Sequence, residues 1–144
     1  MSRDLGDGYE LDDDPARIDR DAVHAFLAEA YWAEGRPREL QDELIDESAR
    51  VVGLYHDGRQ VGFARAVTFD AGRFAYLADV YVLDEHRGRG LGTELVREMV
   101  ENGPFADRRW LLHTRDMHAL YAKLGFGPNE RLVERKPPGW VPPG

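Results

Sequence analysis

The chain has 144 residues, of which 42% are hydrophobic and none is cysteine, and its formal net charge at pH 7 is −8. This length and apolar content are typical of one globular domain, while the lack of cysteine excludes disulfides and thiolate metal sites. The acidic charge argues against a nucleic-acid partner, and no apolar run approaches the roughly 20 residues of a membrane span, so we expect a cytoplasmic protein with no membrane association.

The first half of the chain predicts two helices followed by antiparallel strands. In the helices, apolar residues recur at spacings of three and four, as at Val23, Phe26 and Leu27. In the strands, apolar residues alternate with small or polar ones, and His56-Asp57-Gly58-Arg59 is a hairpin turn signal. The predicted elements are a loose tail at 1–8, a strand at 9–11, helices at about 20–30 and 37–47, and strands at 50–55, 60–69 and 73–83.

The second half predicts one long helix and several shorter elements. Leu91, Leu95 and Met99 fall on one apolar stripe, and Asn102-Gly103-Pro104 is a strong stop signal. Hairpins followed by helical crossovers imply a mixed sheet with helices on both faces, in a single domain over residues 1–144. The predicted elements are a helix from 91 to about 101, a strand at 109–114, a helix at 116–124 capped by Asp116, a strand at 130–135 and an extended tail at 137–144.

The joint between the strand ending at Leu83 and the next helix is rich in glycine and arginine. It reads Arg87-Gly88-Arg89-Gly90-Leu91-Gly92 and continues into Thr93. Glycine lets the backbone turn sharply and approach a ligand closely, and the free N–H groups of a helix N-terminus attract anions. The joint therefore predicts a phosphate or pyrophosphate site, although its spacing is neither that of a Walker loop nor that of a dinucleotide fingerprint. A turn without a ligand is the alternative.

Two motifs carry a resemblance to the GNAT superfamily of N-acetyltransferases. Arg87, Gly90 and Gly92 fit the pattern Arg/Gln-x-x-Gly-x-Gly/Ala, which resembles the coenzyme A pyrophosphate loop of that family. Further along, Leu120-Tyr121 followed by Gly125-Phe126 is similar to the family's Ala-x-x-x-Tyr-x-x-x-Gly-Phe stretch, with fewer residues between the alanine and the tyrosine.

The resemblance implies a GNAT-like α/β fold, with a mixed, mostly antiparallel sheet of six to seven strands flanked by about four helices. It also implies transfer of an acetyl group from acetyl-CoA to a primary amine by direct attack on the thioester. The five histidines show no metal-ligand spacing, so we expect no metal. The coenzyme contacts implied by the family are Tyr81, Val82, Leu83, Arg87, Gly88, Arg89, Gly90, Leu91, Gly92 and Thr93.

Tyr121 is the catalytic residue that the resemblance implies, as the acid that protonates the leaving thiolate. Packing of a helix aromatic against the sheet is the alternative for this residue. The base that takes the amine proton stays open between Asp79, His113 and a chain of water molecules. Asp79 is the one acid inside its strand, and strict alternation places it on the face opposite Tyr76 unless a bulge shifts the phase.

The resemblance also implies that the acceptor site lies at the junction of the first two helices and the sheet. Trp32 lies beside acidic residues there and could hold a cationic amine, and Tyr76 and His113 are the other candidate contacts. The acceptor is a small-molecule or peptide amine whose identity the sequence leaves open, and a homodimer is possible. A non-catalytic acyl-CoA sensor or an interaction module on the same fold is the alternative to an enzyme.

Overall fold

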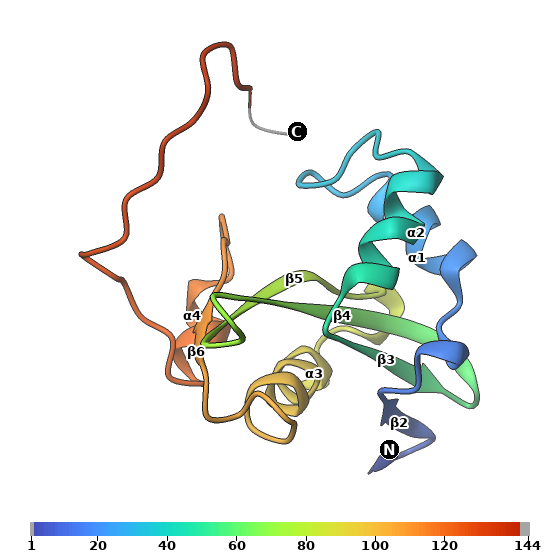
Figure 1. Cartoon of the computed structure of the whole chain (residues 1–144). Helices are drawn as coiled ribbons and strands as arrows, with labels where there is room; N and C mark the ends of the chain where they lie inside the picture. Colours follow the sequence, from blue (N-terminus) through green and yellow to red (C-terminus); the bar gives the residue numbers. More distant parts are fainter. Residues whose placement is uncertain (1, 142–144) are drawn as a thin grey trace.

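The computed structural model describes residues 2–141 and contains one six-stranded sheet. The strands follow each other across the sheet in chain order, and every neighbouring pair is antiparallel except β5 and β6, which are parallel (Figure 1). This arrangement confirms the predicted mixed, mostly antiparallel sheet. The strands are β1 (Ser2–Gly6), β2 (Tyr9–Asp12), β3 (Arg50–His56), β4 (Arg59–Phe69), β5 (Phe74–Val82) and β6 (Arg109–Leu111).

Helices cover both faces of the sheet. One hydrophobic cluster joins α1 and α2 to the sheet through Val23, Ile45 and Phe63, and the other joins α3 to the opposite face through Leu95 and Met99. Figure 1 shows α1 and α2 on one side of the strands and α3 on the other. The helices are α1 (Arg20–Leu27), α2 (Arg38–Glu47), α3 (Leu91–Val100) and α4 (His118–Ala122), with short 3₁₀ turns at Pro15–Arg17 and Asp84–His86.

The N-terminal segment is a strand, so the predicted loose tail at 1–8 is wrong for residues 2–6. β1 pairs antiparallel with β2, and the Arg3 guanidinium reaches α3, where its Nε donates to Glu98 at 2.7 Å. The sequence pattern conceals this strand because Leu5 is its single large apolar residue, and its stability comes from backbone pairing and charge. Residue 1 lies outside the described part of the chain.

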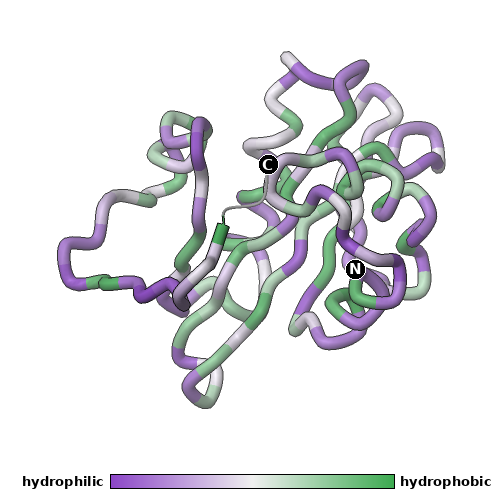
Figure 2. The backbone as a smooth tube through the Cα atoms, turned by 90° about the horizontal axis from the view of Figure 1, so that it is seen from above, coloured by the Kyte–Doolittle hydropathy of each residue, from purple (hydrophilic) through white to green (hydrophobic). Residues whose placement is uncertain are grey.

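The C-terminal segment contradicts the predicted strand at 130–135. These residues extend away from the domain and pair with no strand among residues 2–141 (Figure 1). Leu132 is 57% exposed and Val133 is 89% exposed, and Figure 2 shows mostly hydrophilic colour along this arm. Strand propensity needs a partner edge and a surface to cover, and this arm has neither. Residues 142–144 of the predicted tail lie outside the described residues.

The two preceding elements are shorter than the sequence predicts. β6 ends at Leu111 instead of residue 114, and α4 is capped by Met117 instead of Asp116. The N–H group of Met117 donates to the Thr114 hydroxyl at 3.0 Å in the turn before α4, and no side chain of residues 2–141 caps the first turn of this helix.

A β-bulge in β5 decides which side chains face α1 and α2. Arg65 pairs with Ala78 and Phe63 pairs with Tyr81, so two residues of β5 oppose Ala64 of β4. Asp79 sits in the bulge with a left-handed φ of 55°. The extra residue shifts the alternation, so Asp79 lies on the α1–α2 face together with Arg65 rather than on the α3 face.

Candidate active site

The joint between β5 and α3 presents an unusual run of free backbone N–H groups. Gly88 and Gly90 have φ values of 82° and 76°, and Gly90 is the N-cap of α3. Within residues 2–141 no oxygen accepts a hydrogen bond from the amides of residues 88–93, whereas the Glu94 N–H donates to Gly90 at 3.2 Å. A left-handed turn leading into a helix N-terminus is suited to an anion such as a pyrophosphate.

Side chains brace this loop from both sides. The Arg87 Nε donates to the Val82 carbonyl at 3.1 Å, which ties the loop back to the end of β5. The Tyr9 hydroxyl and His86 Nδ1 are 2.7 Å apart, and the Arg89 guanidinium carbon lies 6.0 Å from the Tyr9 ring centre. The two arginines predicted as coenzyme contacts therefore lie at the loop, Arg87 holding its base and Arg89 close to β2.

Beside the loop, the end of β5 has an open edge. Pairing with β6 stops at Tyr76 and Leu111, whereas β5 continues to Val82. The Leu83 N–H donates to the Val61 carbonyl of β4 at 2.8 Å. Because successive strand residues direct their backbone groups to opposite sides, the Val82 N–H points toward the edge that β6 leaves open.

The Tyr81 side chain is part of the core and does not line this edge. Its ring stacks on Phe26 with the ring centres 4.0 Å apart, and burial raises the pKa of its hydroxyl. By the same alternation the Tyr81 backbone groups point toward β4, so neither its side chain nor its backbone lies at the open edge.

Tyr121 lies at the same end of the molecule as the glycine-rich loop. A Cβ added to Gly92 would lie 3.5 Å from the Leu120 side chain, so α4 packs beside the start of α3. The Phe126 N–H donates to the Tyr121 carbonyl at 3.1 Å, which closes the turn that follows α4. Burial, with a smaller effect of the nearby Tyr31, raises the pKa of Tyr121 to about 12, so its hydroxyl is protonated at neutral pH.

Asp79 is the centre of a buried polar cluster. Its carboxylate accepts hydrogen bonds from Trp32 Nε1 at 2.9 Å, from Arg36 at 2.8 Å and from Arg65 Nε at 2.7 Å. Burial alone would raise the pKa of this carboxyl, but the two guanidinium groups outweigh burial and hold the pKa below its usual range. The Trp32 indole, expected to contact the acceptor, is held against Asp79.

Sequence reasoning missed both arginines of this cluster. The available signal was Arg65, a charged residue at an inward position of the alternating strand Val61, Phe63, Arg65, Val67 and Phe69. Such a residue needs a buried partner of opposite charge.

Tyr76 and His113, two of the predicted acceptor contacts, are neighbours. The Tyr76 hydroxyl and His113 Nδ1 share a hydrogen bond, and His113 Nε2 lies 3.4 Å from a Glu134 carboxylate oxygen. Burial raises the pKa of Tyr76, while the charge of Arg65 acts in the opposite direction. Arg65 and Tyr76 lie on the same face of neighbouring strands, because Arg65 pairs with Ala78, two residues from Tyr76.

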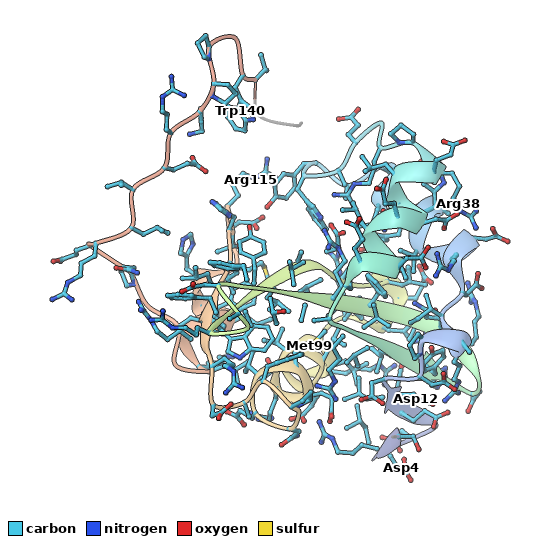
Figure 3. All side chains as sticks on the ribbon, viewed as in Figure 1. Asp4, Asp12, Arg38, Met99, Arg115 and Trp140 are labelled. Atoms are coloured by element: carbon cyan, nitrogen blue, oxygen red, sulfur yellow. The ribbon has the colours of Figure 1, made fainter. Side chains whose placement is uncertain are left out.

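Arg115 lies on the loop after β6 and contacts the segment that follows α1. Its guanidinium carbon lies 3.8 Å from the centre of the Tyr31 ring, which joins the loop after β6 to the segment after α1. Figure 3 shows Arg115 on that loop, directed toward the helical side of the molecule. No sequence motif singled out this residue.

Two further features are absent from residues 2–141. No helix in this range is long and apolar enough to cross a bilayer. No group of three or more His, Asp or Glu side chains in the same range is placed to hold a metal ion.

Comparison with known proteins places this architecture in a family. The family model described as Acetyltransferase (GNAT) family matches residues 12–126. A Gibberella zeae protein that is provisionally named an acetyltransferase is 33% identical over 142 residues, covering 82% of this chain and 78% of that protein. The mycothiol acetyltransferase of Nocardia farcinica is 34% identical over 111 residues, covering 74% of this chain and 36% of the length of that enzyme.

Solved structures agree with the sequence relatives. A crystal structure from Xanthomonas campestris, provisionally described as a GNAT acetyltransferase, matches with a TM-score of 0.81 and 39% identity over 91% of this chain and 94% of that one. An acetyltransferase structure from Clostridium acetobutylicum, solved with acetyl-CoA, has a TM-score of 0.69 and 16% identity over 94% and 96% of the two chains, which shows the fold alone. Because the family model covers strands β3 to β6, the glycine-rich loop and the Tyr121 turn together, the chain belongs to the GNAT family of acetyltransferases.

Proposed function

We propose that this protein transfers an acetyl group from acetyl-CoA to a primary amine by direct attack of the amine on the thioester. The observation that carries the proposal is the meeting of three features at one end of the sheet. These are the free amides of the glycine-rich loop, the Val82 N–H at an open strand edge, and the protonated Tyr121 hydroxyl. The Clostridium acetobutylicum structure, which contains acetyl-CoA on the same fold, supports the choice of coenzyme.

The roles follow from what each group can donate. The loop amides and Arg89 would bind the pyrophosphate, and the Val82 N–H would stabilise the negative charge that develops on the carbonyl oxygen. As the C–N bond forms and the C–S bond breaks, Tyr121 would donate its proton to the sulfur, because a bare thiolate is a poorer leaving group than a thiol.

We assign removal of the amine proton to water. Asp79 is the alternative within the strand, but three donors occupy its carboxylate and its lowered pKa makes it a weak base. His113 already shares its ring nitrogens with Tyr76 and Glu134. Asp79 therefore acts as a positioning residue for Trp32, Arg36 and Arg65.

The test combines thiol release from acetyl-CoA in the presence of a panel of amines with calorimetric binding of CoA. We expect both, and we expect Tyr121→Phe to lower kcat by about 10²–10⁴-fold while coenzyme affinity changes little. The matched control is Tyr55→Phe, because the Tyr55 hydroxyl is buried without a hydrogen-bond partner and lies in β3. That variant should keep full activity.

Two other outcomes would contradict the proposal. Coenzyme binding with no turnover of any amine would indicate a non-catalytic acyl-CoA sensor. No binding of CoA at millimolar concentration would mean that the loop is an ordinary turn.

A further inference from the structure

The buried polar cluster beside the open edge carries one more positive than negative charge. Arg36 and Arg65 share the single carboxylate of Asp79, and the exposed fractions of the three side chains are 14%, 9% and 2%. Within residues 2–141 neither arginine pairs with a second acid. Buried cations are rarely left without a compensating anion.

The guanidinium group of Arg65 has donor atoms that Asp79 does not occupy. Arg65 donates to Asp79 through Nε, while its two terminal nitrogens donate to no oxygen in the described part of the chain. In that part, the buried side-chain polar atoms that lack a partner are Gln41 Nε2 and the Tyr55 hydroxyl. The terminal nitrogens of Arg65 are therefore not sealed in the core, and they form an unused fork of donors open to a ligand.

The surroundings of this fork are those of the acceptor region. Arg65 lies on the α1–α2 face of the sheet next to Tyr76, whose hydroxyl binds His113. A second cation, Arg115, is stacked on Tyr31 and has no carboxylate partner within residues 2–141. The acid on the β6 side, Glu134, is already paired with Lys136 at 3.1 Å and with His113.

We propose that the acceptor amine carries a carboxylate, which binds to the terminal nitrogens of Arg65 and is drawn in by Arg115. This inference rests on the proposed acetyl transfer and names the class of its acceptor as amino acids. A carboxylate is a planar monoanion that accepts two parallel hydrogen bonds from a guanidinium fork, and its single charge matches the single excess charge of the cluster. The proposal adds a carboxylate to the acceptor, whereas the acidic composition and the acids beside Trp32 suggested only a cationic amine.

The experiment compares acceptors that differ only in the carboxylate. The pairs are glycine and glycinamide, β-alanine and its carboxamide, and 4-aminobutyrate and its carboxamide, assayed at equal concentrations of unprotonated amine. Phosphoethanolamine is a separate arm that tests a phosphate in place of a carboxylate. For at least one pair we expect kcat/KM to be about 10- to 100-fold higher for the acid than for the amide, as for a hydrogen bond to a charged group.

Two variants connect this preference to the structure. Arg65→Lys keeps a cation beside Asp79 but lacks the fork, and it should lose most of the preference for the acid. Arg115→Gln changes an exposed side chain, so it should fold normally and reduce the preference severalfold. The matched control is Arg73→Gln, because Arg73 is also exposed and lies near an aromatic ring, but it pairs with Asp70 at the turn between β4 and β5.

The outcomes separate this inference from the proposed function. Turnover with equal rates for acids and amides, or a preference that survives both Arg65→Lys and Arg115→Gln, would overturn the carboxylate site and leave acetyl transfer standing. A higher rate with phosphoethanolamine than with every amino acid would also overturn it. Coenzyme binding with no turnover of any amino acid would count against it, because the panel contains the proposed class, whereas failure to bind CoA would remove the proposed function itself.

Discussion

At the scale of single residues, Asp79 shows how strongly one buried carboxylate determines the arrangement of its neighbours. It occupies a left-handed backbone position and accepts hydrogen bonds from Trp32, Arg36 and Arg65. Replacement by asparagine removes the charge and leaves both guanidinium groups without an anion. We expect Asp79→Asn to lower the free energy of unfolding by about 3–5 kcal/mol, as when one partner of a buried ion pair is removed.

The measurement is urea unfolding at neutral pH, with Asp70→Asn as the control. Asp70 also has a φ of 55° and also binds an arginine, Arg73, but this pair is exposed. Asparagine tolerates the left-handed conformation, so the control should lose less than about 1 kcal/mol. Equal losses in the two variants would show that the backbone conformation, and not the buried charge, explains the effect.

The same carboxylate makes stability depend on pH in a direction that follows from its pKa. The folded protein holds the pKa of Asp79 below its ordinary value of 3.8, so the folded state binds this proton less readily than the unfolded state. The contribution is therefore present above about pH 4 and is lost as the pH falls through the folded value. The difference in unfolding free energy between the wild type and Asp79→Asn should be constant from pH 7 to about 4 and shrink below that.

Tyr121 should not contribute to the pH dependence of activity, unlike the contribution of Asp79 to stability. Its pKa of about 12 keeps the hydroxyl protonated across the range in which acetyl-CoA can be assayed. The pH profile of kcat should therefore show no decrease due to Tyr121 at alkaline pH, and any basic limb below pH 10 should persist in Tyr121→Phe. A limb that disappears in the variant would mean that Tyr121 titrates within the assay range.

At the scale of elements, the joint between β5 and α3 depends on its glycines for conformation. Gly90 is the N-cap of α3 with a φ of 76°, and an added Cβ would meet no atom within 4 Å. Gly90→Ala should therefore cost about 1–2 kcal/mol through the left-handed backbone alone, without a steric clash. Because the free amides of the loop depend on this conformation, we also expect CoA to bind at least tenfold more weakly, measured by calorimetry.

Gly72 offers a matched control for this loop. It has a φ of 78°, also faces open space, and lies in the turn between β4 and β5. Gly72→Ala should lose similar stability and keep its affinity for CoA. A similar loss of affinity in both variants would show that the effect comes from general destabilisation and not from the loop.

Elements with a periodic apolar pattern could be predicted from the sequence, and those decided by pairing could not. The stripe of Leu91, Leu95 and Met99 determines α3 because burial follows the helical period. In contrast, β1 has little apolar content and exists through its ladder with β2, while residues 130–135 have strand-forming residues but no partner strand within residues 2–141. The bulge at Asp79 also depends on pairing, because the register with β4 shifts there.

The residues of the candidate site also divide into those set by local sequence and those set by tertiary packing. The glycine-rich loop and the turn after Tyr121 are local motifs, so their residues could be named from the sequence. Arg36, Arg65 and Arg115 come together with Asp79 and Tyr31 through tertiary packing, and no spacing along the chain indicates this.

At the scale of the whole molecule, the N-terminal strand is connected to α3, the helix that begins at the glycine-rich loop. Arg3 donates to Glu98 at 2.7 Å, and Arg50 of β3 binds both the carboxylate and the backbone carbonyl of Glu98. β1 thus lies at the edge of the sheet, while the side chain of Arg3 helps to hold α3 in place.

Deletion of residues 1–6 therefore tests whether the two parts of the molecule are coupled. The deletion removes the β1–β2 ladder and the Arg3–Glu98 pair, so it should lower the free energy of unfolding by at least about 2 kcal/mol. Because α3 carries the loop at its N-terminus, CoA affinity should fall as well, whereas deletion of residues 137–144 should change neither quantity, since residues 137–141 are exposed. Unfolding followed in urea and calorimetry with CoA would measure both effects, and an N-terminal deletion as stable as the full chain would show that β1 does not support α3.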